Sequence, residues 1–116
     1  MADEGRIKTQ RVLVGLAERL AGCASLRPGS IGVVMLGEDG GDYQVECQAG
    51  SARIATAGTP RVHQFEILGR PDKVRALLSG EHDAVTLFLS GGIRLRGDLR
   101  YVSDLARELG IIEKSL

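Results

Sequence analysis

Apolar residues recur at helical spacing near the start of the chain, between about residues 6 and 22. Leucine and alanine side chains repeat at i, i+3, i+4 and i+7, which places them on one face of a helix. Gly22 follows the last of them and predicts the end of this helix. The residues of the apolar face are Leu13, Leu16, Ala17 and Leu20.

A change of period then predicts strands. Residues 31–36 are an almost continuous apolar run, which is typical of a strand that is buried for most of its length. In residues 43–47 apolar and polar positions alternate, as they do in half-buried antiparallel strands. Residues 37–42 have the composition of a hairpin loop, and 58–60 breaks the third strand. We expect strands over 31–36, 43–47, 52–56 and 62–68.

The helical period returns in the second half of the chain. Pro71 and Asp72 suit the first turn of a helix, because proline has no needed donor there and an acid favours the positive end of the helix dipole. We expect this helix to end at Gly80. Residues 82–89 are ambiguous, since their strand propensity is spread over too short a stretch.

A strand and a last helix follow. Residues 93–96 alternate between apolar and basic side chains. Asp98 is the expected N-cap of the last helix, and Gly110 is its expected stop. The apolar stripe of this helix is Val102, Leu105, Ala106 and Leu109, and that of the helix before it is Val74, Leu77 and Leu78.

Strands that are grouped apart from helices indicate an α+β domain rather than a parallel α/β sheet. A chain of 116 residues is long enough for one domain and too short for two, so we expect a single domain over residues 1–116. The sheet is expected to be antiparallel, with its apolar face toward the helices. The opposite face is expected to be wet, because it carries Gln44, Glu46, Arg94 and Arg96.

A motif in the second half of the chain resembles a known family. The run Leu77-Leu78-Ser79-Gly80 is followed, after a short interval, by Ser90-Gly91-Gly92-Ile93-Arg94-Leu95-Arg96-Gly97-Asp98. This arrangement resembles the C-terminal half of sterol carrier protein 2 domains. The resemblance implies a five-stranded sheet with helices packed on one face, and a short helix over residues 82–89. It also implies an elongated apolar tunnel that takes lipids, sterols or fatty acyl groups.

The apolar face of the sheet and the helices above it either close on each other or leave a cavity. Close packing is the usual state of protein interiors, whereas the resemblance favours a pocket. We therefore expect a hydrophobic small molecule to bind between sheet and helices, driven by the removal of apolar surface from water. The residues expected to bind it are Tyr43, Val45, Ile54, His63, Phe65, Ile67, Leu77, Leu78, Leu87, Phe88, Ile93, Leu95, Val102 and Leu105.

Three residues of the same strand faces carry polar groups. His63 shares the parity of Phe65, so we expect it to point inward, as a hydrogen-bonded core residue, a polar anchor for a ligand or a general base. Tyr43 is either an anchor or a residue at the core edge. Cys47 is expected to be a small buried hydrophobe. No acid–base pair is apparent, so we name no catalytic residue, and an enzyme acting on an apolar substrate is the least favoured alternative.

Composition argues against several other classes of protein. The 15 basic and 15 acidic residues give no net charge, whereas nucleic-acid binders usually carry a basic excess. Cys23 and Cys47 lack the spacing of a metal site, and residues 38–42 lack that of a calcium loop, so we expect neither metal nor cofactor. With no apolar signal core and no run near the ~20 residues that span a bilayer, we expect a cytoplasmic protein.

Partners other than a ligand are suggested by charge and by the size of the chain. Arg94, Arg96 and Arg100 form a small basic cluster beside Arg70. Solvated charges are the simplest interpretation, and the alternative is a transient contact with an acidic partner or an anionic membrane surface. A ligand-free interaction module, or a homodimer through a sheet edge or a helix face, is the alternative function.

Overall fold

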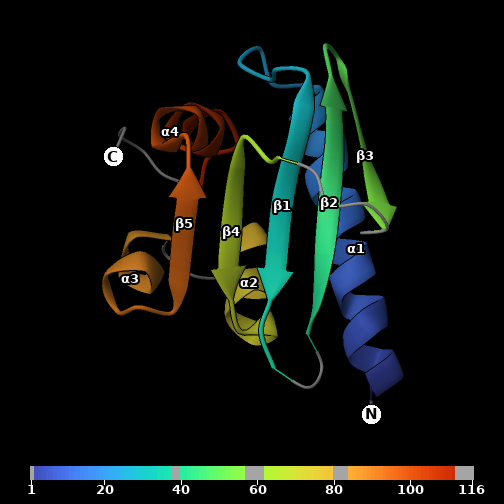
Figure 1. The fold of residues 1–116 in the computed structure, drawn as a ribbon, viewed down its shortest axis with the longest axis vertical. Helices are drawn as coiled ribbons and strands as arrows, with labels where there is room; N and C mark the ends of the chain where they lie inside the picture. Colours follow the sequence, from blue (N-terminus) through green and yellow to red (C-terminus); the bar gives the residue numbers. More distant parts are fainter. Residues whose placement is uncertain (1, 38–39, 57–61, 80–83, 112–116) are drawn as a thin grey trace.

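The computed structural model describes residues 2–37, 40–56, 62–79 and 84–111. In these ranges the chain forms one five-stranded sheet and its flanking helices (Figure 1). The strands are β1 (Gly29–Met35), β2 (Gly41–Gln48), β3 (Ser51–Thr56), β4 (Phe65–Gly69) and β5 (Ile93–Gly97). The helices are α1 (Ala2–Ala21), α2 (Pro71–Ser79), α3 (Ala84–Leu89) and α4 (Leu99–Glu108).

The sheet is mixed, with the strand order β3-β2-β1-β4-β5. β1 pairs antiparallel with β2 but parallel with β4, where Ile31 lies opposite Phe65. The prediction of a purely antiparallel sheet is therefore wrong for the β1–β4 pair. After the antiparallel run β1, β2, β3, the chain passes from the β3 edge to the far side of β1, and β4 then runs in the same direction as β1. Residue alternation within a strand does not encode this crossover.

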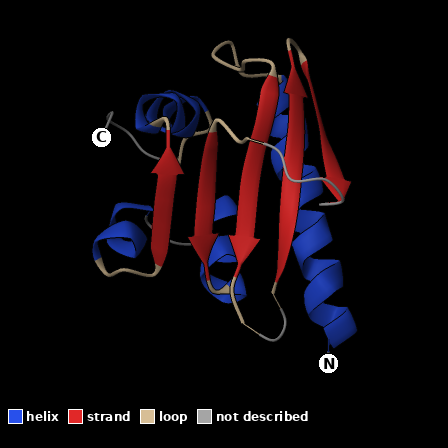
Figure 2. Ribbon diagram, viewed as in Figure 1, coloured by secondary structure: helices blue, strands red, loops and turns tan. Residues whose placement is uncertain are grey.

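The helices cover one face of the sheet unevenly (Figure 2). α1 lies behind β1, β2 and β3, and α2 lies behind β4. α3 and α4 lie near the two ends of β5 (Figure 1). The long helix therefore covers one half of the sheet, and three short helices surround the other half.

The core under α1 is closed. Leu13 of α1, Val33 of β1 and Val45 of β2 are completely buried where this helix meets the sheet. Tyr43 and Ile54 are partly buried and pack against the same cluster. In this half of the molecule the apolar pattern therefore produced ordinary close packing.

The Gly97-Asp98 pair joins β5 to α4 by a specific geometry. Gly97 has a φ of 104°, and a Cβ at this position would lie 2.5 Å from the Gln64 carbonyl oxygen. Only glycine fits such a close approach. The Asp98 carboxylate accepts the backbone N–H of Tyr101 at 3.1 Å, which confirms the predicted N-cap. Because this hydrogen bond favours the charged carboxylate, the pKa of Asp98 is lowered.

The outer face of the sheet is less wet than expected. Gln44 is only 4% exposed, so the prediction that it faces water is wrong. Ser30 donates to Gln44 Oε1 at 3.3 Å, and its Oγ lies 2.8 Å from His63 Nδ1. His63 thus lies over the outer face beside Gly32, where a Cβ would be 2.7 Å from the imidazole ring.

The prediction that His63 points inward is therefore wrong as well. The alternation was extended back to Val62, whereas β4 begins only at Phe65. Residues 62–64 precede the strand, and their side chains do not follow its period. The chain arrives over the outer face and enters the sheet at Phe65.

Other element bounds differ from the predictions by a few residues. α1 begins at Ala2 rather than near Arg6, because its polar first turn carries no apolar period to reveal it. α3 confirms the helix implied by the resemblance over residues 84–89. Several predictions lie outside the described residues, namely those for 38–39, 58–60, Gly80 and 82–83.

Candidate functional site

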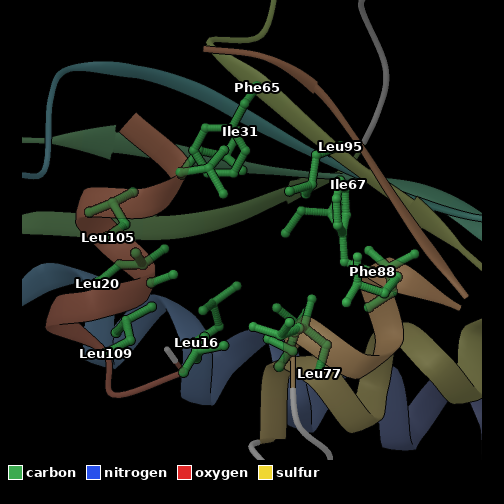
Figure 3. A pocket seen from close by; sticks show the side chains of 18 residues that line it. Leu16, Leu20, Ile31, Phe65, Ile67, Leu77, Phe88, Leu95, Leu105 and Leu109 are labelled. Carbon is green, nitrogen blue, oxygen red and sulfur yellow. The ribbon is translucent and has the colours of Figure 1, made fainter. Parts of the chain in front are cut away.

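An apolar pocket lies under β4 and β5, and its inner wall is completed by Leu16 and Leu20 of α1 and by Ile31 of β1. Its volume is about 260 Å³. Figure 3 shows the lining side chains directed into this space from the sheet and from the helices. They are Leu16, Leu20, Ile31, Phe65, Ile67, Leu77, Leu78, Ala84, Val85, Phe88, Leu89, Ile93, Leu95, Val102, Leu105, Ala106, Leu109 and Ile111.

Strand register builds the sheet side of the pocket. Ile67 of β4 lies directly opposite Leu95 of β5, and Phe65 and Ile93 share their parity on the two strands. Alternate residues of a strand point to one face, so all four side chains face the helices. Among their outward neighbours, Arg96 pairs with Glu66 at 3.2 Å on the opposite face, where Leu68 lies opposite Arg94. The period-two pattern thus keeps the charged side chains of the two strands away from the pocket.

α3 forms one wall of the pocket and is itself exposed. Val85, Phe88 and Leu89 are spaced i, i+3 and i+4, so they share a helical face. They line the pocket, yet 41%, 44% and 77% of their respective surfaces are accessible to solvent. The pocket therefore opens beside α3.

α4 forms the opposite wall, and an aromatic contact fixes its first turn. The Tyr101 side chain is completely buried, with its ring 5.5 Å from that of Phe65 in an edge-to-face arrangement. Its hydroxyl oxygen accepts the backbone N–H of Arg27 at 2.9 Å. The Arg27 guanidinium lies 4.4 Å from the centre of the Tyr101 ring and 3.2 Å from Asp98. Burial raises the pKa of Tyr101, so this phenol stays protonated.

A carboxylate holds the last turn of α4. Glu108 accepts the backbone N–H of Ala24 at 2.8 Å through one oxygen and that of Ser25 at 2.9 Å through the other. Hydrogen bonds from the Ser25 side chain and from these two backbone groups lower the pKa of Glu108. α4 is therefore tied at both ends to the segment between α1 and β1, which fixes this wall of the pocket.

The chemistry of the lining is uniform. Every lining side chain in the described part of the chain is a hydrocarbon, with no acid, base, hydroxyl, amide or thiol among them. Such a surface removes apolar groups from water, and the described side chains of the lining carry no general acid, base or nucleophile. This lining is suited to holding an apolar group.

Sequence comparison identifies no relative, since no protein-family model and no curated protein matches the chain. Solved structures do match it. The chain aligns with palmitated SCP2L2 from Aedes aegypti with a TM-score of 0.65 at 14% identity, over 90% of this chain and 95% of that one. It aligns with the UbiJ-SCP2 ubiquinone synthesis protein with a TM-score of 0.61 at 11% identity, over 81% and 77% of the two chains.

The protein has a sterol carrier protein 2-like fold. The same fold also occurs inside a larger enzyme. The sec-alkylsulfatase Pisa1 from Pseudomonas sp. matches with a TM-score of 0.60 at 14% identity, where 86% of this chain covers 15% of the enzyme. The resemblance inferred from the 77–98 motif is thus confirmed at the level of the fold.

The sterol carrier protein 2-like fold brings most of the predicted site residues to the pocket. Those that line it are Phe65, Ile67, Leu77, Leu78, Phe88, Ile93, Leu95, Val102 and Leu105. Tyr43, Val45 and Ile54 lie instead in the closed half under α1. Leu87 is buried on the other side of α3, and His63 is on the outer face of the sheet.

Sequence reasoning missed several lining residues, which are Leu16, Leu20, Ile31, Ala84, Val85, Leu89, Ala106, Leu109 and Ile111. Most of them stand at helical spacing from residues already recognised. Val85 and Leu89 share a face with Phe88, so a helical period for residues 84–89 selects them in place of Leu87. The helical spacing is present in the sequence, but it could not be applied while residues 84–89 were undecided between helix and strand.

Nucleophilic and metal chemistry find little support elsewhere in the described residues. Cys47 is buried, and burial raises the pKa of its thiol to about 11, so it remains protonated and unreactive. No group of three or more metal-ligating side chains gathers anywhere in the described ranges. No described helix is long and apolar enough to cross a membrane.

Proposed function

We propose that this protein binds a hydrophobic small molecule, such as a lipid, a sterol or a fatty acyl chain, with its apolar part in the pocket under β4 and β5. The observation that carries the proposal is the open pocket of about 260 Å³, which the described residues line with hydrocarbon side chains alone. Native interiors rarely leave an apolar space of this size. Structures with the same fold support the proposal, because one is named a sterol carrier protein and another is named as palmitated.

The driving force is the hydrophobic effect. Each 100 Å² of apolar surface removed from water contributes about 2.5 kcal/mol, before the cost of association is subtracted. Because none of the described lining side chains can form a hydrogen bond, selectivity arises from shape and from the length of the apolar chain. A polar head group on the ligand remains at the mouth, because its burial without partners is unfavourable.

A blocking variant tests the proposal. Ala106 lies on the pocket side of α4, so an indole placed there by Ala106→Trp fills the space that a ligand needs. The matched control is Val14→Trp, at a half-exposed position of α1 that does not line the pocket. Palmitic acid is titrated into delipidated protein by calorimetry, and circular dichroism verifies the fold of each variant.

We expect wild type and Val14→Trp to bind with equal affinity, and Ala106→Trp to lose affinity at least about tenfold. Failure of the wild type to bind palmitic acid or cholesterol would argue for a ligand-free interaction module. Equal binding by the folded Ala106→Trp variant would place the ligand elsewhere on the molecule.

A further inference from the structure

The outward face of α1 is exposed and carries two apolar side chains. Ile7 and Val14 stand seven residues apart, about two helical turns, and each is half exposed. At roughly 100° per residue they share their side of the helix with Arg11 and Glu18, whereas the buried Leu16 points the opposite way, into the core. This face can therefore contribute both apolar area and charge to an interface.

Gly15 lies on the same side of α1, in the middle of the helix. Glycine is unfavourable inside a helix relative to alanine. A Cβ at Gly15 would meet no atom of the described chain within 4 Å, so the missing side chain makes room for nothing in the protein's own fold. The distance between two packed helices depends on the side chains at their contact, so a glycine lets a second helix approach closely. Gly15 thus offers a shallow hollow beside the protruding Val14.

Two charged residues flank this hollow symmetrically. Arg11 and Glu18 are exposed, and neither makes an ion pair within the described residues. They stand about 10 Å apart along the helix axis, too far to pair with each other. The midpoint between them falls between Val14 and Gly15. The face is therefore self-complementary, with a base and an acid at equal distances on either side of one point.

We propose that two copies of this chain associate through the outward faces of α1, antiparallel about a two-fold axis between Val14 and Gly15. In such a contact residue i of one copy meets residue j of the other, and j meets i. Val14 then packs on Gly15 of the second copy, and Arg11 pairs with Glu18 of the second copy. Each contact occurs twice.

The same two-fold axis brings the other exposed apolar side chain onto a glycine. Ile7 lies opposite Gly22 of the second copy, where an added Cβ would have one neighbour within 4 Å, a carbonyl oxygen of its own chain. A parallel pair of helices is a poorer match, because it sets like charges against each other at Arg11 and at Glu18. An anionic bilayer is also a poorer match, since these two residues give the face no net charge.

Contact through α1 leaves the apolar pocket accessible. In Figure 1, α1 lies on the opposite side of the molecule from α3, beside which the pocket opens. Leu16 and Leu20 of α1 line the pocket from the inner face of the helix, away from the proposed contact. The dimer therefore holds two open pockets, and its formation does not depend on the proposed function.

Reversal of single charges tests the arrangement. Arg11→Glu and Glu18→Arg are prepared separately, and their association is measured by sedimentation over a range of protein concentrations. The matched control is Arg100→Glu, which reverses an exposed charge on α4. Circular dichroism verifies the fold of each variant.

We expect wild type and Arg100→Glu to dimerise with equal association constants. Each reversal on α1 should lower that constant about tenfold or more, because two attractive contacts per dimer become repulsive. An equimolar mixture of the two reversed variants should associate again, since every charged contact between unlike chains then joins opposite charges. Gly15→Ala should weaken association about threefold or more, although it favours the helix of the single chain.

A wild-type protein that stays monomeric at every concentration would overturn the proposal, as would a dimer that neither reversal weakens. A mixture of folded Arg11→Glu and Glu18→Arg that remains monomeric would overturn the antiparallel arrangement. A monomeric wild type that floats with anionic vesicles, and loses this binding in Ile7→Ser/Val14→Ser, would assign the face to a bilayer instead. Binding of palmitic acid enters none of these results, so failure of the dimer leaves the proposed function intact.

Discussion

At the scale of single residues, a polar cluster on the outer face of the sheet depends on a glycine that makes room for a histidine. Gly32 leaves room for the imidazole of His63 on the outer face of the sheet, and the buried Ser30 and Gln44 complete a polar cluster there. Residue parity could not predict this cluster, because it forms between a strand and a segment that is not yet part of one. Where the strand itself begins, at Phe65, parity placed the side chain correctly.

Two glycine substitutions should have opposite effects on stability. Gly97→Ala places a Cβ 2.5 Å from the Gln64 carbonyl oxygen at a φ of 104°, so the free energy of unfolding should fall by about 2 kcal/mol or more. Gly15→Ala lies inside α1 with no atom within 4 Å of the new Cβ, so it should raise that energy by up to about 1 kcal/mol. Urea denaturation measures both, and a tolerated Gly97→Ala would contradict the close approach.

At the scale of elements, α4 is held by groups from outside its own sequence. Tyr101 and Glu108 bond to backbone N–H groups of Arg27, Ala24 and Ser25, all from the segment between α1 and β1. The stripe Val102, Leu105 and Leu109 was predictable from its period, and the cap at Asp98 from its residue type. The three long-range hydrogen bonds were not predictable, because no local pattern relates these residues.

The Glu108 contacts should make stability depend on pH. The folded-state pKa of Glu108 is lowered, so its contribution is fully present above its unfolded value of about 4.3 and is lost as pH falls through the lowered value. Urea midpoints of the wild type should therefore decrease between about pH 5 and pH 3. Glu108→Gln, with one acceptor for two N–H groups, should be less stable at pH 7 and less sensitive to acid. Parallel pH profiles for the two proteins would show that this carboxylate does not hold α4.

The local sequence of α3 does not decide between a helix and a strand, and the rest of the fold determines which of them forms. The sequence from Ala84 to Leu89 contains valine, threonine and phenylalanine, which favour strands, in a segment too short for a period to emerge. The structure makes it a helix, and Gly92 donates its N–H to the Leu87 carbonyl at its C-terminal end. The helical spacing of Val85, Phe88 and Leu89 then explains why these three side chains form one face, which lines the pocket and is also exposed to solvent.

At the scale of the whole molecule, one long helix and three short ones divide the sheet into a closed half and an open half. α1 covers β1, β2 and β3 and closes the core with Leu13, Val33 and Val45. Near β4 and β5 the three short helices do not cover the sheet completely, and the pocket lies between them and these two strands. The sequence predicted an apolar interface between sheet and helices, but which part stays open depends on the crossover that places β4 beside β1.

The most direct test of the account is a methyl NMR titration of the delipidated protein with palmitic acid. The account predicts that methyl signals of Leu77, Leu105 and Leu109 shift with saturation at one ligand per chain. Those of Leu13, Val33 and Val45, in the closed half, should stay in place. Signals that shift only in the closed half, or no signal that shifts at all, would contradict a ligand pocket under β4 and β5.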